Sequence, residues 1–403
     1  MKYSEWKNVK LSDIADITMG QSPKSEFYNN EGIGIEFLQG NRTFGRIYPD
    51  YDTWCTKPSR IAEEGSVLMS VRAPVGDLNI ANKRVCIGRG LCSLKTKNNN
   101  NNMFLYYLLE YNKRNMINNQ TGTIFGSINK SFIESMQVRI PKSILEQEKI
   151  METLSTIDYK IELNNKINNN LEELAQTLYK HWFVDFEFPN EEGLPYKSSG
   201  GKMVDSELGL IPDGWEVKEV IDLFNFVGGS QPPKKEHIYE NKEGYVRFIQ
   251  NRDYSGNDNH ITYIKESPRN KLCDETDIMM DKYGEAGKVR FGISGAYNVA
   301  LAKIDSKDVD KEYLRRYFEQ SSIENYILNA SQASTRPSVN QTVFTNLKVA
   351  YPPTKLLNKF NEISRNIIIK TLLYRSENKK LAEMRDLLLP KLMSGEIRLP
   401  IEE

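Results

Sequence analysis

The sequence repeats itself at an offset of 209 to 211 residues, and this repeat constrains the fold more than any other feature. At an offset of 209 residues the matches are Trp6 with Trp215, Asp13 with Asp222, Gly20 with Gly229 and Pro23 with Pro232. At an offset of 211 residues the matches are Phe37 with Phe248, Gln39 with Gln250, Gly76 with Gly287, Ser127 with Ser338, Asn129 with Asn340 and Pro141 with Pro352. An ordered series along 135 residues indicates a diverged tandem duplication of about 200 residues.

Each copy begins with a part that mixes short apolar runs with helical patterns. The runs at 65–71 and 246–250 predict strands, whereas 103–112 and 311–320 predict helices. The predicted fold class is therefore α+β.

Each copy continues with a long helical pattern. Apolar residues in the first copy alternate in steps of four and three, with two asparagines in the middle positions: Ile150, Leu154, Ile157, Ile161, Asn164, Asn168, Leu171 and Leu178. The second copy repeats the rhythm with Leu356, Phe360, Ile363, Ile367, Tyr374, Leu381, Met384 and Leu388. Pro390 is predicted to end the second helix. Each helix would run for about 34 residues, or roughly 50 Å.

Such a helix can pack on its own domain, because any amphipathic helix has an apolar face. Two of them at matching places in a duplicated chain favour pairing with each other. Between the copies, residues 189–214 combine Pro, Gly and Ser with little apolar periodicity, which is typical of a linker. The predicted segments are a first mixed domain at 1–144, a long helix at 145–188, the linker, a second mixed domain at 215–354, and a long helix with a tail at 355–403.

Charge is balanced over the chain, with 54 Lys and Arg against 54 Asp and Glu. This excludes a chain-wide basic footprint for nucleic acid, although not a local one. The net charge is +6 for residues 1–144, −8 for 145–214, −1 for 215–354 and +3 for 355–403. An acidic helix would not lie along phosphates, so 145–188 is interpreted as a spacer or as a docking surface for a basic partner.

The four cysteines form no CxxC pair, and the three histidines add no metal spacing. We expect reduced thiols and a cytoplasmic protein. The sequence has no apolar run of about 18 residues that would span a membrane. Its N-terminus lacks the apolar region of a secretory signal.

Catalytic motifs are missing. The segment GEAGK at 284–288 lacks the spacing and the hydroxyl residue of a phosphate-binding loop, and YPPT at 351–354 lacks the polar and aromatic residues of an amino-methyltransferase motif. These absences favour a binding protein over an enzyme.

Longer stretches resemble the specificity subunits of type I restriction–modification systems. They are WKNVKLSDIADITMGQSP, GIEFLQGNR, GSVLMSVRAPVGDLNIA, CIGRGL, SINKSFIESMQVRIP, EQEKIMETLSTIDYKIELNN, LYKHWFVDFEFP, LGLIPDGWEV and LAEMRDLLLPKLMSGEIRL. The resemblance covers essentially the whole chain, and the duplication is part of it. The second copy departs from the pattern, with DKYGEAGKVRFGISGAYNVA in place of the RAPVGDLNIA and GRGL wording. In this family, such variation accompanies a change of target sequence.

The resemblance implies two target-recognition domains, related by approximate two-fold symmetry and separated by two long helices in an antiparallel coiled coil. Each domain would read one half of a bipartite, asymmetric site in double-stranded DNA. Two modification subunits would bind S-adenosylmethionine and methylate adenine. Restriction subunits would add translocation and cleavage with ATP and Mg. This chain itself would hold no cofactor, no metal and no catalytic residue.

Arg, Lys, Asn and Gln on loops are the expected readers of DNA base edges and phosphates. The candidates in the first domain are Gln21, Ser22, Arg42, Arg72, Lys83, Arg89, Thr123, Ser127, Asn129 and Lys130. Those in the second domain are Gln231, Lys234, Lys235, Arg252, Tyr283, Lys288, Arg290, Arg336 and Asn340. The alternative for each is a solvated charge or a polar residue that caps a turn.

Other singled-out residues are interpreted as structural. We expect positive φ angles at four matched turn glycines, Gly20, Gly76, Gly229 and Gly287. Phe37 and Phe248 are predicted to lie in the core. Trp182 and Phe183 pack either in a core or against a partner or the second domain.

Two rival functions stay open at this point. A two-domain coiled-coil scaffold could bind protein partners only, and filter binding to random duplex DNA separates it from a DNA reader. A degenerate enzyme is the third possibility, which methyl transfer by the purified chain alone would support.

Overall fold

The computed structural model has a mixed α+β fold and describes residues 5–97, 101–118, 127–255, 261–307, 309–332 and 338–400. Internal contacts divide the chain into two compact units. Unit 1 comprises Met1–Glu162 together with Asn378–Glu403, and unit 2 comprises Leu163–Glu377. The long helices α4 (Ile144–Tyr179) and α7 (Thr354–Ser394) each contribute to both units. The predicted α+β class is confirmed.

Unit 1 folds into three sheets in its described part. A pair joins β1 (Trp6–Lys10) to β11 (Gln137–Pro141). A four-stranded sheet has the order β2 (Ala15–Met19), β10 (Leu91–Thr96), β7 (Val67–Ser70) and β8 (Leu78–Ile80). A five-stranded sheet has the order β3 (Tyr28–Asn29), β5 (Trp54–Cys55), β4 (Ile35–Leu38), β9 (Val85–Ile87) and β6 (Ile61–Ala62).

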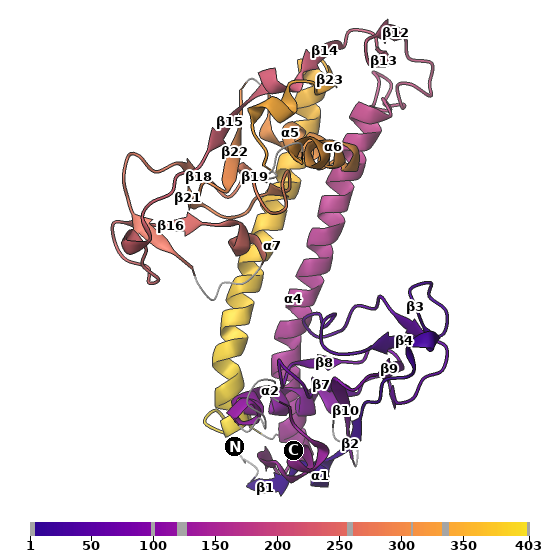
Figure 1. The fold of residues 1–403 in the computed structure, drawn as a ribbon, viewed down its shortest axis with the longest axis vertical. Coiled ribbons are helices and arrows are strands. Elements are labelled where there is room, and N and C mark those ends of the chain that lie inside the picture. The colour runs from indigo at the N-terminus through magenta and orange to yellow at the C-terminus, as the bar shows by residue number, and fades with distance from the viewer. Residues whose placement is uncertain are drawn as a thin grey trace. The chain divides into compact units, whose positions relative to one another are not determined.

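Helices cover the four-stranded sheet of unit 1 and share its core. The helices of this copy are α1 (Leu11–Ile14), α2 (Asn102–Asn118) and α3 (Lys130–Ser135). α2 packs against β7 and β8 (Figure 1). Ile150 and Leu154 of α4 and Leu392 and Met393 of α7 are at most 1% exposed in the same core.

Unit 2 repeats this arrangement. A pair joins β14 (Glu216–Glu219) to β23 (Lys348–Tyr351). A four-stranded sheet has the order β15 (Phe224–Gly228), β22 (Leu301–Ser306), β19 (Ile278–Asp281) and β20 (Val289–Arg290). A second four-stranded sheet has the order β17 (Tyr263–Lys265), β16 (Tyr245–Ile249), β21 (Gly295–Tyr297) and β18 (Leu272–Cys273).

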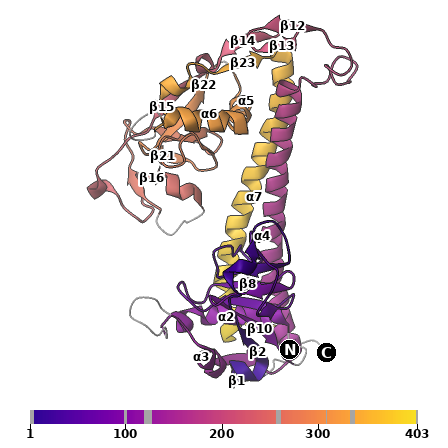
Figure 2. The same ribbon diagram turned by 45° about the vertical axis from the view of Figure 1, so that its right-hand side comes forward.

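The helices of the second copy are α5 (Lys311–Phe318) and α6 (Ser321–Ser331), and α5 packs against β22 (Figure 2). The core of unit 2 is closed by both long helices. Phe360 of α7 is fully buried, with ring centroids 5.9 Å from Tyr179, 6.1 Å from Trp182 and 4.9 Å from Phe183. Trp182 and Phe183 therefore lie in a core, and this core is formed with the second domain, since Phe183 also contacts Trp215 and Tyr313.

The duplication seen in the sequence is also present in the strand connections. In each copy a parallel pair lies in a small sheet, with Phe37 beside Cys86 in unit 1 and Phe248 beside Ala296 in unit 2. These two phenylalanines are 3% and 1% exposed, as predicted for core residues.

The long helices bury a stripe that is more polar than predicted. Ile150, Leu154, Ile157, Ile161, Asn164 and Asn168 of α4 are buried, in agreement with the heptad pattern. On α7, however, Ile363 and Met384 are 41% and 50% exposed. Ser364, fully buried, and Arg385, with a side chain 24% exposed, lie on the inner face in their place. The apolar rhythm is therefore one residue out of phase at these two points.

Pro390 does not end α7, which continues to Ser394. A proline removes one backbone hydrogen bond from a helix. Here the following turn is held by the burial of Leu392 and Met393, each 1% exposed, and this packing offsets the loss. The helices are also longer than predicted, with 36 residues in α4 and 41 in α7.

The segment 189–214, predicted as a linker, contains a hairpin of β12 (Met203–Ser206) and β13 (Gly209–Pro212). Aromatic contacts fix its ends. Phe188 stacks on Tyr196 at 4.5 Å and on Trp215 at 5.4 Å between ring centroids.

We predict that Phe360→Ala destabilises unit 2 by about 3–5 kcal/mol, because it removes a fully buried ring from an aromatic cluster. Leu373→Ala is the matched control on the same helix, since Leu373 is 63% exposed. It should change the free energy of unfolding by less than about 0.5 kcal/mol. Urea denaturation followed by circular dichroism measures both, and equal losses would contradict the assigned core.

Candidate nucleic-acid interface

Several candidate residues of unit 1 meet where four chain segments converge. We call this meeting point, formed by residues 20–22, 38–40, 71–72 and 87–90, the loop junction of unit 1. Five backbone hydrogen bonds close it: Gly20 N to Leu91 O at 2.9 Å, Gln21 N to Ile87 O at 3.0 Å, Gly88 N to Leu38 O at 2.8 Å, Gly90 N to Gln39 O at 3.2 Å and Val71 N to Gly90 O at 2.9 Å. The junction therefore holds Gln21, Ser22, Arg72 and Arg89 together.

A small polar network lies on this junction. The Ser22 hydroxyl accepts hydrogen bonds from the Gln39 side-chain amide at 2.9 Å and from the Arg89 backbone N–H at 3.1 Å. Gln21, Gln39, Arg72 and Arg89 are exposed. The junction thus presents amide and guanidinium donors on a fixed backbone, which suits contacts to base edges and phosphates.

Unit 2 has the same loop junction, formed by residues 229–231, 249–250, 282–283 and 297–300. Its backbone hydrogen bonds are Gly229 N to Leu301 O at 3.2 Å, Ser230 N to Tyr297 O at 3.0 Å, Asn298 N to Ile249 O at 3.0 Å and Lys282 N to Ala300 O at 2.8 Å. Gln231 and Tyr283 are its exposed candidates.

Close backbone approach explains two of the matched glycines, and the predicted positive φ was wrong for them. A Cβ atom on Gly20 would lie 2.1 Å from Gly88 O, and one on Gly229 would lie 2.1 Å from Asn298 O. The prediction is confirmed at the other pair, where φ is 85° at Gly76 and 90° at Gly287.

Three further candidates of unit 1 are exposed but engaged in ion pairs. Arg42 lies 2.6 Å from Asp52, Lys83 lies 2.7 Å from Glu36, and Lys130 lies 3.5 Å from Glu134. The hydrogen bond from Arg42 lowers the pKa of Asp52. Arg42 and Asp52 keep side-chain exposures of 75% and 49%, so a phosphate could replace the carboxylate without desolvating a buried charge.

In unit 2, Gln231, Lys234, Lys235 and Arg252 are exposed, and Lys288 lies 3.7 Å from Glu324. Arg290 differs from them, because its side chain is only 17% exposed and pairs with Glu285 and, at 3.0 Å, with the buried Asp281. Burial raises the pKa of Asp281 to about 6, although Arg290 opposes the rise. Arg290 thus stabilises a turn, and its availability to DNA is lower than the sequence implied.

Asn129 and Asn340 each cap a helical turn, Asn129 at the start of α3 and Asn340 at the start of a 3-10 turn. The Asn129 side chain accepts from Phe132 N at 2.9 Å, and that of Asn340 accepts from Thr342 N at 3.0 Å. Ser127 forms a backbone bridge with Arg72. Thr123 and Arg336 lie outside the described residues.

Gln39 and Gln250 were missed as candidates. Both follow a buried strand, and the Gln250 side-chain amide lies 3.4 Å from the Thr262 hydroxyl. The signal was present, because the two glutamines match in the repeat at an offset of 211 residues.

Within the described ranges, no three His, Cys, Asp or Glu side chains group as a metal site. All four cysteines are buried and free. Among the same residues, no helix is both long and apolar enough to cross a membrane.

One family model matches both copies of the repeat. The profile of the type I restriction modification DNA specificity domain matches residues 3–173 and 212–370, and the chain therefore belongs to this family. Its role is DNA sequence specificity within a type I restriction–modification complex, and it is not an enzyme.

Individual relatives agree. The chain is 28% identical over 418 residues to the MjaIX specificity subunit of Methanocaldococcus jannaschii, covering 98% of this chain and 94% of that protein. It is 40% identical over 177 residues to a MjaX specificity subunit of the same organism, covering 43% of this chain and 41% of that one. The crystal structure of a type I S subunit from M. genitalium has a TM-score of 0.63 at 17% identity, covering 99% and 97% of the two chains, and this likeness concerns the fold.

We predict that Gly20→Ala destabilises unit 1 by about 1–3 kcal/mol, because the added Cβ cannot fit beside Gly88 O without opening the loop junction. Gly40→Ala is the matched control, since no atom lies within 4 Å of its added Cβ. Thermal unfolding should be impaired only by the first substitution. Equal behaviour of the two variants would show that the junction tolerates displacement.

Proposed function

We propose that the chain reads a bipartite, asymmetric DNA site, with one half-site contacted by each loop junction. The observation that carries this proposal is that both copies hold the same backbone junction with different side chains around it. The side chains at the first loop junction include Gln21, Arg72 and Arg89. Those at the second loop junction include Gln231, Lys282 and Tyr283. Recognition of two different half-sites requires different side chains on the same backbone framework. The remaining predicted candidates would contact phosphates or flanking bases.

We further propose that α4 and α7 form an antiparallel coiled coil that spaces two recognition domains related by pseudo-two-fold symmetry. Contacts inside each unit support an antiparallel course. In unit 1, Asp158 meets Arg385 and Glu146 meets Arg398. In unit 2, Asn164 meets Glu377 and Tyr179 meets Phe360. Residue numbers rise on one helix as they fall on the other. In this proposal the recognition domains are 1–144 and 215–354, and the helices begin at 145 and 355.

The family implies the partners. In the proposed complex two modification subunits supply S-adenosylmethionine and methylate adenine, and restriction subunits supply ATP- and Mg-dependent translocation and cleavage. This chain determines which site on double-stranded DNA the complex recognises. The exposed acids Glu148 and Glu152 of α4 offer a surface to a basic partner. Four free, buried cysteines fit a cytoplasmic complex.

Exchange of residues 1–144 for those of another family member should change one half-site only. The exchanged segment must keep the apolar residues that receive Leu392 and Met393, because these close the core of unit 1. Mapping of methylated adenines in cells that express the complex measures the outcome. A shift of both half-sites, or of neither, would overturn the two-reader proposal.

Arg42→Ala tests a single candidate. A bidentate contact from arginine to guanine is worth about 1–3 kcal/mol, so its loss should relax one position of the first half-site. Binding to a panel of singly substituted duplexes measures this. Arg84→Ala is the matched control, because Arg84 is exposed and lies 3.2 Å from Glu63 in a similar surface pair. A loss that is uniform across the panel would instead assign Arg42 to a phosphate.

A further inference from the structure

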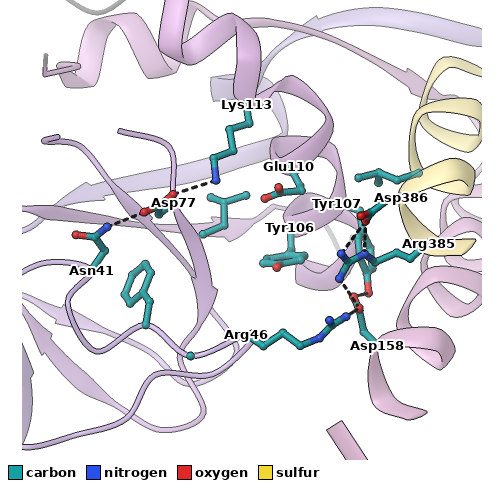
Figure 3. A pocket seen from close by; sticks show the side chains of 14 residues that line it. Asn41, Arg46, Asp77, Tyr106, Tyr107, Glu110, Lys113, Asp158, Arg385 and Asp386 are labelled. Carbon is teal, nitrogen blue, oxygen red and sulfur yellow. Dashed lines mark hydrogen bonds and ion pairs between the residues drawn. The ribbon is translucent and has the colours of Figure 1, made fainter. Parts of the chain in front are cut away.

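A buried carboxylate on α4 collects three partners from three different parts of unit 1. Asp158 has a side chain 2% exposed. It accepts a hydrogen bond from the Tyr107 hydroxyl of α2 at 2.7 Å and one from Arg385 of α7 at 3.1 Å, and it pairs with Arg46 (Figure 3). We call Asp158, Arg46, Tyr107 and Arg385 the Asp158 centre.

The charges of this centre are consistent with its burial. Arg385 also donates to Asp386 at 2.7 Å, so the two arginines are balanced by two carboxylates. Burial and the neighbouring Asp158 raise the pKa of Tyr107, which keeps its hydroxyl protonated as a donor. A buried pair that keeps both partners is stable, whereas removal of one leaves an uncompensated charge.

Arg46 belongs to a loop that is fastened to the four-stranded sheet. The Asn79 amide of β8 donates to Gly45 O at 2.9 Å, and Ile80 N donates to Ile47 O at 2.6 Å. Asn41 at the start of the same loop donates to Asp77 at 2.7 Å. The backbone of the loop that carries Arg46 is therefore held by the four-stranded sheet.

A cavity of about 410 Å³ separates this loop from the helices. Its lining includes Phe44, Tyr106, Glu110 and Leu389, and Arg46 reaches Asp158 along one side of it (Figure 3). Apolar packing does not fill this space, and the ion pair of Arg46 with Asp158 crosses it, whereas the neighbouring Ile47 lies in the main core of unit 1.

The first copy is also attached to the long helices through its hydrophobic core. The main core of unit 1 joins α4 and α7 to the four-stranded sheet through Ile150, Leu154, Leu392 and Met393. The five-stranded sheet packs on Leu68 of β7 and Leu91 of β10 in one small core and has a second small core of its own, and among the residues described neither core includes a member of α4 or α7. The core gives one point of attachment and the Asp158 centre gives a second. Two points are needed to fix an angle.

We propose that the Asp158 centre is a positioning device that sets the angle of the first loop junction on the long helices, and so the distance at which the first half-site is read. This inference rests on the proposed bipartite recognition. The residues of the centre are positioning residues that act through the junction without touching DNA.

Unit 2 has its own attachment with different chemistry. Phe291, which follows β20, lies under the guanidinium groups of Arg315 at 4.4 Å and of Arg375 of α7 at 4.3 Å. The buried Arg316 of α5 donates to Glu172 of α4 at 2.7 Å. Because neither attachment uses a residue of the Asp158 centre, a change at Arg46 should affect the first half-site alone.

The test uses the complete complex with its modification subunits and duplexes that carry the mapped half-sites. The unread gap is kept, shortened by one base pair or lengthened by one base pair. Arg46→Met, which keeps the length of the side chain but removes its charge, should lower the discrimination between the correct and altered gaps by about fivefold. The affinity of Arg46→Met for the duplex with the correct gap should fall by less than about fivefold. Arg46→Lys should retain most of the discrimination.

Arg84→Met is the control, because it removes an exposed ion pair with Glu63 in the same copy. It should leave gap discrimination unchanged. A uniform loss over all three gaps in Arg46→Met, or no change, would overturn the positioning role. Asp158→Asn provides a second variant, and Arg46→Met decides the question if that protein does not fold. If the unsubstituted complex fails to distinguish the half-sites from random duplex, the proposed function is what fails.

Discussion

Neither copy of the repeat closes its own hydrophobic core, and the rest of the structure depends on this constraint. The core of unit 1 needs Leu392 and Met393 from the far end of the second copy. The core of unit 2 needs Tyr179, Trp182 and Phe183 from the end of the first. Burial of a Leu or Met side chain in such a core is worth about 2–5 kcal/mol against alanine. A compact unit is thus not a contiguous repeat, and unit 1 closes only when the last helix is present.

The sequence predicted the elements that have a clear apolar pattern. Both long helices were found because their apolar residues recur at helical spacing, and the strands at 65–71 and 246–250 were found as short apolar runs. The error at Met384 on α7 has a physical cause. A pattern of apolar residues selected Met384, whereas Arg385 takes the inner place because Asp158 lies opposite it. Likewise Pro390 was judged by its local backbone chemistry, and the tertiary burial of the next turn outweighed it.

The sequence suggested candidate residues by type, but it could not give the partners of their side chains. The repeat located the loop junctions, since Gly20 and Gly229 match at the points where backbones approach most closely. It could not show that Asn129 and Asn340 cap helical turns, or that Arg290 pairs with Asp281, because these contacts depend on tertiary geometry.

The same turn is built with different chemistry in the two copies. Ser70 and Asp281 occupy equivalent places, and the carbonyl of each accepts the N–H of a positive-φ glycine, Gly76 at 3.0 Å and Gly287 at 2.8 Å. The Ser70 hydroxyl accepts from Asp77 N at 2.9 Å, whereas the Asp281 carboxylate binds Arg290. The backbone is retained while the charge of the turn changes, which lets one framework present two different surfaces.

The acids of the first long helix fall into two groups, one that faces inward and forms ion pairs within the chain and one that faces outward. Glu146, Asp158 and Glu172 of α4 face inward, and each pairs with an arginine from a distant part of the chain. Arg398, Arg385 and Arg316 supply the opposite charges, and all three belong to the second copy. Loss of one partner from a buried pair costs about 3–5 kcal/mol. These acids therefore specify which segments of the second copy meet α4 and in which register. Only the outward acids, such as Glu148 and Glu152, remain for a basic partner.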